Sequence, residues 1–553
     1  MDIIDKYGNT PLILACCHNS DEIALKILEH PKECKLNKVN RNGFTALIMA
    51  CKNGFGKVAL KILEYPEECN ISQICENRNT ALMWACDKGL EEVVLKLLEH
   101  SEKCKISKVN KYGYTAFNYA CREGLGKAAL KMLEHPKECK LDQVSKIGAT
   151  SLMFSCGSGL NTVALKLLEH PKQCKLDHVD KYGKTVLNYA CVAGLENVSL
   201  KILEHTKQRK FDHISDDSTT VLIDACYIGL ENVALKILEH PEECKLDHIN
   251  NNGNTALIWA CNKGLEKVAL KMLEYPERCA LDQIIKMNST VLINACNCSL
   301  EKVALKLLEH PKECNLDYVN NNGVNALIMA CAHSLEKVAL KMLEHPKECN
   351  LDKIDNDSDT ALIVACSNGL EEVALKMLEY PEKCKMGQIN NNNITALIYA
   401  CQQGSEEVAL KILEYPEECN LGQVNNNGNT ALIWACKKGL EEVALKILEY
   451  PKECKIDHLT KNCFTAFIWA QKHNLNNVIL KIKKIQRKYA KTFPLYTKNQ
   501  CIICWEDTNK YYCIPECKHC ICICNECDIY NLNKCSLCRN KINHETIFSL
   551  SIT

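Results

Sequence analysis

The chain has 553 residues, with 68 lysines and arginines against 68 aspartates and glutamates, so it has no general charge that would attract nucleic acid or an anionic membrane. No apolar run approaches the roughly 18 residues of a membrane-spanning helix, and the opening stretch MDIIDKYGNTPLILAC lacks a charged-then-apolar leader. We therefore expect a cytoplasmic protein with no membrane segment, no secretory leader and no nucleic-acid partner.

A unit of 35 residues, typified by residues 425–459 (NNNGNTALIWACKKGLEEVALKILEYPKECKIDHL), returns along the chain without an insertion. Its threonine recurs in phase at Thr10, Thr45, Thr80, Thr115, Thr150, Thr185, Thr220, Thr255, Thr290, Thr360, Thr395, Thr430 and Thr465, with Asn325 in the remaining copy. Fourteen copies in a fixed register predict a stacked array of one supersecondary unit, because separate globular domains would not keep that register.

Each unit predicts a finger and two short helices. The Asn-Gly pair before Thr430 suits a backbone position with positive φ and indicates the tip of a hairpin-like finger. Thr430 is expected to cap the first helix and Gly439 to end it. The second helix has an apolar stripe and a possible pair between Glu442 and Lys446, and Pro451 stops it. Such a unit cannot bury its own apolar faces, so each copy must lie against its neighbours.

The succession of finger, T-A-L-x-x-A, Gly and V-A-L-K-x-L resembles the ankyrin repeat over roughly residues 1–490. In this sequence Ile433 or Asn118 stands where the family has a histidine, and the unit is longer than the usual ~33 residues. The resemblance implies an all-α solenoid of about 14 repeats with short hairpin fingers over residues 1–495, whose last copy is a cap. Long arrays of this style are similar to those of large DNA viruses and of amoebal or intracellular bacterial genomes. A viral protein of this kind would lie in the host cytoplasm.

Most of the 39 cysteines fall at two positions of the unit. Thirteen occupy the first-helix position of Cys436, twelve of them after an alanine, and twelve occupy the turn position of Cys34, eleven of them in P-x-x-C. The prediction is a small buried thiol in a reducing compartment. A metal site made by His30 and Cys34 is the alternative, but Tyr65 replaces the histidine in another copy whose cysteine remains.

Comparison among copies separates framework from variation. The residue before Thr varies widely, and we take it as the fingertip: Phe44, Asn79, Tyr114, Ala149, Lys184, Val324, Asp359 and Ile394. The two residues before the helix-ending Gly vary as freely, for example Tyr227 and Ile228. Because fingers and first helices form the concave face of ankyrin-like arrays, we predict that this face binds a protein.

An aromatic residue recurs two positions before the first-helix cysteine: Trp84, Tyr119, Phe154, Tyr189, Trp259, Tyr399, Trp434 and Trp469. Aromatic side chains suit binding hot spots, but the same spacing equally suits packing between copies, and both interpretations stay open. In the last copy Gln471 replaces the cysteine and Asn474 replaces Gly. We expect a polar end cap whose outer side carries Lys481, Lys483, Lys484, Arg487, Lys488 and Lys491.

The repeat stops before residue 501, and residues 496–553 form a second predicted domain. Ten cysteines and one histidine lie within 38 residues, including three C-x2-C pairs. A segment this short with so many thiols is expected to fold around zinc, which takes thiolate and imidazole ligands.

The order of these residues resembles a RING finger, and the resemblance implies two Zn²⁺ ions. The ligands would be Cys501, Cys504, Cys517, His519, Cys524, Cys527, Cys535 and Cys538, with the first and third pairs on one ion. His519 lies one residue further from Cys524 than the usual spacing, so Cys520 is the alternative fourth ligand.

Further residues match RING fingers that act as ubiquitin ligases. Ile502 and Leu537 stand where such domains contact a ubiquitin-conjugating enzyme, and Arg539 matches the position that bridges that enzyme and ubiquitin. Ser536 replaces the usual proline. The C-terminal place and the tail NKINHETIFSLSIT resemble inhibitor-of-apoptosis RINGs, whose tail mediates dimerisation; here the tail could instead cover the domain's own core.

We therefore expect a protein-binding solenoid joined to a RING-type E3 ubiquitin ligase that acts by positioning, with no catalytic nucleophile of its own. The alternative is a non-enzymatic ankyrin scaffold whose zinc module is structural or makes a homodimer.

Overall fold

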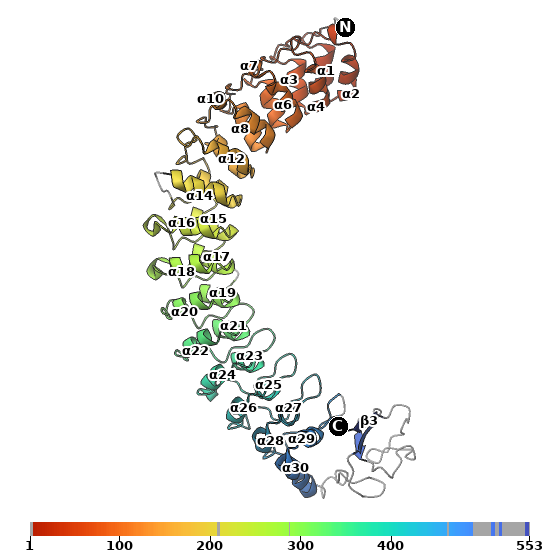
Figure 1. Ribbon diagram of the computed structural model, residues 1–553, viewed down its shortest axis with the longest axis vertical. Coiled ribbons are helices and arrows are strands. Elements are labelled where there is room, and N and C mark those ends of the chain that lie inside the picture. Colours follow the sequence, from red (N-terminus) through yellow and green to blue (C-terminus); the bar gives the residue numbers. More distant parts are fainter. Residues whose placement is uncertain are drawn as a thin grey trace. The chain divides into compact units, whose positions relative to one another are not determined.

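The structure is a computed structural model that describes residues 4–206, 211–286, 288–461 and 464–489, with side chains to residue 485, and the backbone of residues 510–514, 519–522 and 548–551. The chain divides into two compact units, Met1–Ala280 and Leu281–Thr553. Within each unit, successive copies lie side by side (Figure 1).

Each copy contributes two short helices. In the first unit the first helices are α1 (Pro11–Cys17), α3 (Ala46–Lys52), α5 (Ala81–Asp87), α8 (Ala116–Arg122), α11 (Ser151–Gly157), α13 (Val186–Val192), α15 (Val221–Ile228) and α17 (Ala256–Asn262). The second helices are α2 (Asp21–Ile27), α4 (Gly56–Ile62), α6 (Glu91–Leu98), α9 (Gly126–Met132), α12 (Asn161–Leu167), α14 (Glu196–His205), α16 (Glu231–Ile237) and α18 (Glu266–Met272).

The second unit continues the pattern. Its first helices are α19 (Val291–Asn297), α21 (Ala326–Ala332), α23 (Ala361–Ser367), α25 (Ala396–Gln403), α27 (Ala431–Lys438) and α29 (Ala466–Lys472). Its second helices are α20 (Glu301–Leu307), α22 (Glu336–Met342), α24 (Glu371–Met377), α26 (Glu406–Ile412), α28 (Glu441–Ile447) and α30 (Asn476–Tyr489). The predicted repeat of two helices is thus confirmed in the described residues.

The helix boundaries follow the predicted residues. The Thr430 hydroxyl accepts a hydrogen bond from the Ile433 N–H at 3.2 Å, which satisfies one of the free donors at the start of α27. Asn325 does the same for Ile328 at 2.9 Å, so the one exception to the threonine keeps the cap. Gly439 ends α27 with φ of 77°, a left-handed conformation that glycine adopts without strain.

Packing runs between copies as well as within them. Each first helix contacts the next first helix of its unit, and second helices pair in the same way, as for α13 with α15 and α14 with α16. Leu432 and Ala435 of α27 and Val443 and Ile447 of α28 are fully buried. Burial of each leucine, valine or isoleucine contributes about 1.5–3 kcal/mol, and a single copy offers no partner for these faces.

The segment after the second helix forms a short turn helix in several copies: η1 (Pro31–Glu33), α7 (Ser101–Cys104), α10 (Pro136–Cys139), η2 (Pro241–Glu243), η3 (Pro276–Arg278) and η4 (Pro381–Lys383). The ion pair expected between Glu442 and Lys446 is replaced by one between Lys446 and Glu449, at 3.2 Å. The two residues are three positions apart, which places both side chains on one helix face.

The last helix carries the features expected of an end. In α30, which packs on α28 and α29, Val478 and Ile482 are buried, whereas Leu480 is 64% exposed. Lys484 is exposed, and Lys481 and Lys483 are partly exposed. Arg487 and Lys488 lie on the helix beyond the described side chains, and Lys491 lies outside the described residues.

A small sheet lies in the cysteine-rich segment. Its strands are β1 (Lys510–Ile514), β2 (His519–Cys522) and β3 (Phe548–Ser551), in the order β2-β1-β3, and both pairings are antiparallel. The C-terminal tail therefore adds a strand to the sheet of its own chain. Among the described helices, none has the length and apolar character needed to cross a bilayer.

Candidate protein-binding face

In most copies a polar side chain five residues before the threonine organises the finger. In the fourth copy the Asn110 Oδ1 atom accepts hydrogen bonds from the N–H groups of Tyr112, at 2.9 Å, and Tyr114, at 3.0 Å. The Gly113 N–H donates to the Asn110 carbonyl at 3.2 Å, which closes a four-residue turn. Lys111 and Tyr112 are therefore the apex of the finger, and both are exposed.

The expected fingertip position is wrong. The residue directly before the threonine faces the array: Phe44, Asn79 and Ala149 are only 6%, 4% and 2% exposed. Where the base of the finger is a polar residue, its side chain accepts a hydrogen bond from this residue's N–H, as Asn110 does from Tyr114. The exposed apex lies three and four residues before the threonine. Asx-turn chemistry is the sequence signal that could have located it.

Neighbouring fingers are joined through their backbones. The Lys146 N–H donates to the Tyr112 carbonyl at 3.0 Å, and the Lys181 N–H donates to the Ile147 carbonyl at 3.0 Å. In the second unit the Asn391 N–H donates to the Asp357 carbonyl at 2.9 Å. These bonds fix the register of successive apices.

The two variable residues before the helix-ending glycine lie at the surface, as predicted, and in two adjacent copies both are apolar. Val192 at the end of α13 is 53% exposed, and Tyr227 and Ile228 at the end of α15 are 49% and 36% exposed. We call these three residues the apolar patch. The Tyr227 ring meets the Trp259 ring edge-on at 4.7 Å, and Lys263 Nζ lies 5.5 Å from the Tyr227 ring centre. Tyr227 is thus held in place while half of it faces solvent.

Several aromatic residues of the row on the first helices pack or form hydrogen bonds within the array. Tyr119 is 8% exposed, and its hydroxyl accepts a hydrogen bond from Asn110 Nδ2 at 3.0 Å. The Tyr189 hydroxyl donates to Asp180 Oδ2 at 2.7 Å, and burial together with this carboxylate raises the pKa of Tyr189. The Phe154 ring packs against Tyr114 of the preceding copy at 5.7 Å. These contacts favour the packing interpretation of the row.

The position that differs from the family's histidine also links copies. Asn118 accepts from the Thr115 N–H at 2.8 Å, and its Nδ2 donates to the Ser151 hydroxyl of the next copy at 2.8 Å. In the sixth copy Asn188 Nδ2 donates to Asp224 Oδ2 at 2.9 Å. Where asparagine stands in this position, a side-chain hydrogen bond ties two copies together.

The turn cysteines cap the second helix. Cys34 Sγ lies 3.2 Å from the Ile27 carbonyl, and Cys104 Sγ lies 2.8 Å from the Leu97 carbonyl, so each thiol donates to a carbonyl at a helix end. Burial raises the pKa of the Cys104 thiol to about 12. These contacts support the packing role rather than a metal site at His30 and Cys34.

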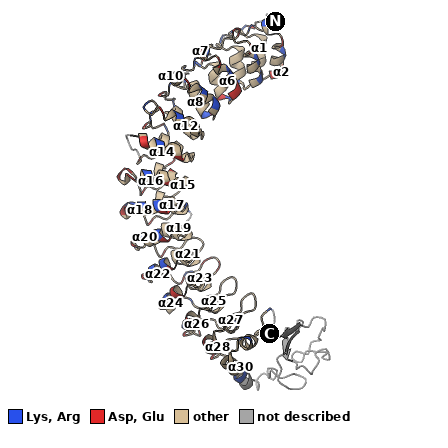
Figure 2. Cartoon of the chain, viewed as in Figure 1, with Lys and Arg blue, Asp and Glu red and all other residues tan. Residues whose placement is uncertain are grey.

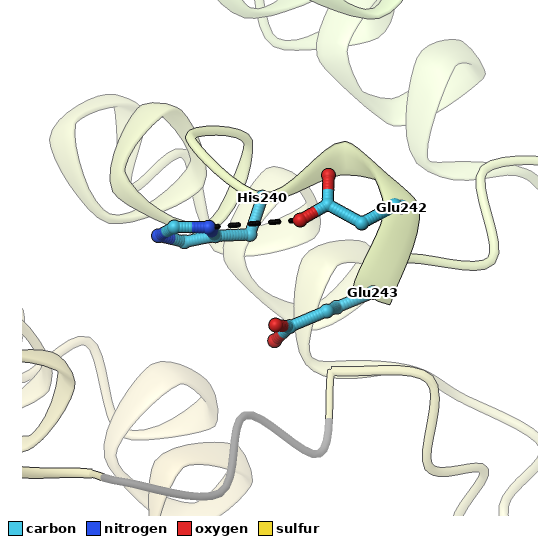
Figure 3. A group of neighbouring side chains, drawn as sticks. All are labelled: His240, Glu242 and Glu243. Carbon is cyan, nitrogen blue, oxygen red and sulfur yellow. Dashed lines mark ion pairs between the residues drawn. The ribbon is translucent and has the colours of Figure 1, made fainter.

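Within the described repeats, one group of side chains has donors close enough for a metal ion: His240, Glu242 and Glu243, at the turn after α16 (Figure 3). His240 Nδ1 lies 3.7 Å from Glu242 Oε1, and the Glu242 side chain is 67% exposed. An exposed pair of this kind contributes little, because water screens it.

The predicted zinc ligands fall mostly outside the described residues: Cys501, Cys504, Cys517, Cys524, Cys527, Cys535 and Cys538. So do the three residues predicted to contact a conjugating enzyme, Ile502, Leu537 and Arg539. His519 and Cys520 are neighbours on β2, where they pair with Ile514 and Cys513 of β1. The choice between these two ligands stays a prediction.

The comparisons with known proteins support the repeat. The family model described as ankyrin repeats (3 copies) matches residues 1–73, 59–143, 339–425 and 362–462. No curated protein matches the chain. The four matches, the pair of helices with a capped first helix in every copy and the finger that precedes them lead to one conclusion: the chain contains ankyrin repeats, and its described repeats form an all-helical solenoid.

Proposed function

We propose that the solenoid captures a protein partner on its finger face, by which we mean the finger apices and the exposed ends of the first helices. The observation that carries the proposal is the apolar patch of Val192, Tyr227 and Ile228. In the other copies at least one of the two residues before the helix end is polar or glycine. An exposed tyrosine held by a neighbouring tryptophan suits a hot spot, because little side-chain entropy is lost when a partner covers it.

The test is a double substitution, Tyr227→Ser with Ile228→Ser, in the full chain. The matched control is Gln402→Ser with Gln403→Ser, which changes the equivalent positions of the twelfth copy. Proximity labelling in cells, with circular dichroism to confirm that both variants fold, compares the labelled proteins. We expect the patch variant to lose specific partners that the control keeps. Identical partner sets for the two variants would contradict a role for the patch.

A second function rests on the cysteine-rich segment. Its ten thiols and one imidazole within 38 residues form a donor set that suits two Zn²⁺ ions. Cys501, Cys504, Cys524 and Cys527 would hold one ion, and Cys517, His519, Cys535 and Cys538 the other, with Cys520 as the alternative to His519. Bound zinc would supply the fold of this segment and no redox or hydrolytic chemistry.

On this basis the protein would be a cytoplasmic RING-type E3 ubiquitin ligase or the substrate receptor of one. Ile502 and Leu537 would contact a ubiquitin-conjugating enzyme, and Arg539 would bridge it to ubiquitin. Rate enhancement would come from holding the thioester close to a protein captured by the solenoid.

Ile502→Ala tests this function. In a reaction with zinc, activating enzyme and a panel of conjugating enzymes, the parent chain should form ubiquitin chains and the variant should not. Native mass spectrometry should find two zinc ions in both, which separates a lost contact from a lost fold. A parent chain that is silent across the panel would leave the scaffold alternative, which Ser536 favours.

The scaffold alternative predicts a homodimer through the tail. Removal of residues 540–553 would also remove β3, which pairs with β1 of the same chain, so zinc content has to be measured beside molecular size. A truncated chain that keeps its zinc and becomes a monomer would support the scaffold alternative.

A further inference from the structure

Three lysines occupy the same place on three successive fingers. Lys111, Lys146 and Lys181 are the first apex residues of the fourth, fifth and sixth fingers, and all three are exposed. Within the described repeats, no carboxylate lies within ion-pair distance of any of them. Many other lysines of the array are paired, such as Lys131 with Glu134 at 2.7 Å.

Tyrosines accompany these lysines. Tyr112 and Tyr182, the second apex residues of the fourth and sixth fingers, are 49% and 43% exposed. Lys146 Nζ lies 5.6 Å from the Tyr112 ring centre, and Lys181 Nζ lies 4.7 Å from the Tyr182 ring centre. Each ammonium group is thus steadied over a ring face while its other sides meet solvent. We call Lys111, Lys146, Lys181, Tyr112 and Tyr182 the cationic finger row.

Acidic residues bound this row on both sides. The corresponding apex residue is Glu76 on the third finger, and the seventh finger carries Asp216 and Asp217. All are in the first unit, and Asp216 is joined to the row by its N–H, which donates to the Tyr182 carbonyl at 2.9 Å. Across the described repeats both signs of charge are mixed (Figure 2), so this run of unpaired cations is a local segregation in a chain of zero net charge.

We propose that the cationic finger row binds an extended acidic segment of a protein, with a carboxylate at about every third residue. Packed helices lie about 8–10 Å apart, so equivalent lysines on adjacent fingers are separated by a similar distance. An extended chain in the polyproline II conformation advances about 3.1 Å per residue with three residues per turn, so side chains three residues apart lie on one face and span one finger. The tyrosines would cover the apolar or backbone surface between carboxylates. The inference rests on the proposed capture of a protein and names the chemistry of its partner.

The bounds of the row favour a short peptide over a nucleic acid. Duplex DNA carries one negative charge per ~1.7 Å, so three cations spaced by a whole repeat would leave most phosphates unpaired. A continuing polyanion would also meet Asp216 and Asp217 at one end and Glu76 at the other. An acidic segment of seven to nine residues, at roughly three residues per finger, ends before it reaches them.

The experiment uses the full chain and three fluorescein-labelled peptides of ten residues. One has Glu at positions 2, 5 and 8, one has the same residues with the three Glu adjacent, and one has Gln in place of Glu. Fluorescence anisotropy gives their Kd values at low and at physiological salt. The test variant is Lys111→Gln with Lys146→Gln and Lys181→Gln. The control variant is Lys32→Gln with Lys137→Gln and Lys172→Gln, three exposed lysines in the turns after the second helices.

We expect the spaced peptide to bind more tightly than the other two, and more weakly as salt rises. Exposed ion pairs contribute a factor of about two to five each, so the test variant should raise Kd roughly ten- to a hundredfold and the control variant less than twofold. Equal binding of the spaced and adjacent peptides, or equal Kd for the two variants, would overturn the proposal.

An oligothymidine of fifteen nucleotides serves as a competitor. If it binds more tightly than the spaced peptide and loses affinity in the test variant, the row is a nucleic-acid site and the proposal fails. The proposed capture function is judged separately, because the substitutions in the apolar patch leave all three lysines in place. Loss of partners in the patch variant with no peptide binding would overturn only the inference about the row.

Discussion

Asn110→Ala should lower the free energy of local opening of the fourth finger more than the same substitution lowers it in the thirteenth finger. Asn110 is 4% exposed and makes four hydrogen bonds: two from backbone N–H groups to Oδ1, and two from Nδ2, to Asn79 Oδ1 at 2.7 Å and to the Tyr119 hydroxyl at 3.0 Å. At about 1 kcal/mol net for each bond, the loss is about 2–4 kcal/mol of local stability. Asn425→Ala is the comparison.

The Asn425 Oδ1 atom accepts from the N–H groups of Asn427, at 3.0 Å, and Asn429, at 2.9 Å. With two bonds at stake, the expected loss is about 1–2 kcal/mol. Hydrogen exchange is the suitable assay, because a long repeat array does not unfold in one step and each finger opens locally. The free energy of opening is read from the backbone amides of Tyr112 and Tyr114, and of Asn427 and Asn429.

Asn110→Asp separates the two kinds of bond. A carboxylate keeps both acceptor bonds, and in the sixth copy Asp180 accepts from the Tyr189 hydroxyl at 2.7 Å in the same arrangement. This variant should therefore lose less than Asn110→Ala. The reasoning would be refuted if aspartate were as damaging as alanine, or if alanine changed the opening free energy by less than about 0.5 kcal/mol.

Three further predictions concern glycine, pH and thiols. Gly323→Ala should lower the free energy of local opening by roughly 3 kcal/mol, and Gly439→Ala by roughly 1–2 kcal/mol, as measured by hydrogen exchange. Both glycines have positive φ, but only at Gly323 would an added Cβ collide with the Ile354 carbonyl. Burial raises the pKa of Asp224, so folding favours its protonated form. The free energy of opening near α15 should therefore fall as pH rises from the ordinary aspartate pKa through the raised one. Asp224→Asn should remove this pH dependence in hydrogen-exchange measurements. Iodoacetamide at pH 8 should label the partly exposed Cys17 well before Cys121, because burial raises the pKa of the Cys121 thiol to about 12. Peptide mass spectrometry can follow the two labelling rates. Equal rates would show that the array opens faster than we expect.

Local contacts within one copy determine much of the fold. The fixed register of Thr430 and its equivalents predicts a cap every 35 residues, and each cap needs only the residues that follow it. Gly439 ends a helix because its own backbone adopts positive φ. The thiol of Cys34 is satisfied by a carbonyl seven residues earlier. Contacts of this range lie within one copy, so one copy of the sequence is sufficient to predict them.

Exposure was decided only by the tertiary structure. Phe44 and Tyr227 are both aromatic residues at variable positions, yet one is 6% and the other 49% exposed. Whether such a residue is covered depends on what packs against it. Lys52 of the same copy lies 4.8 Å from the Phe44 ring centre, whereas Trp259 of the next copy leaves half of Tyr227 free. The unit's sequence sets its own hydrogen bonds, whereas its binding surface is what remains after the neighbours have packed.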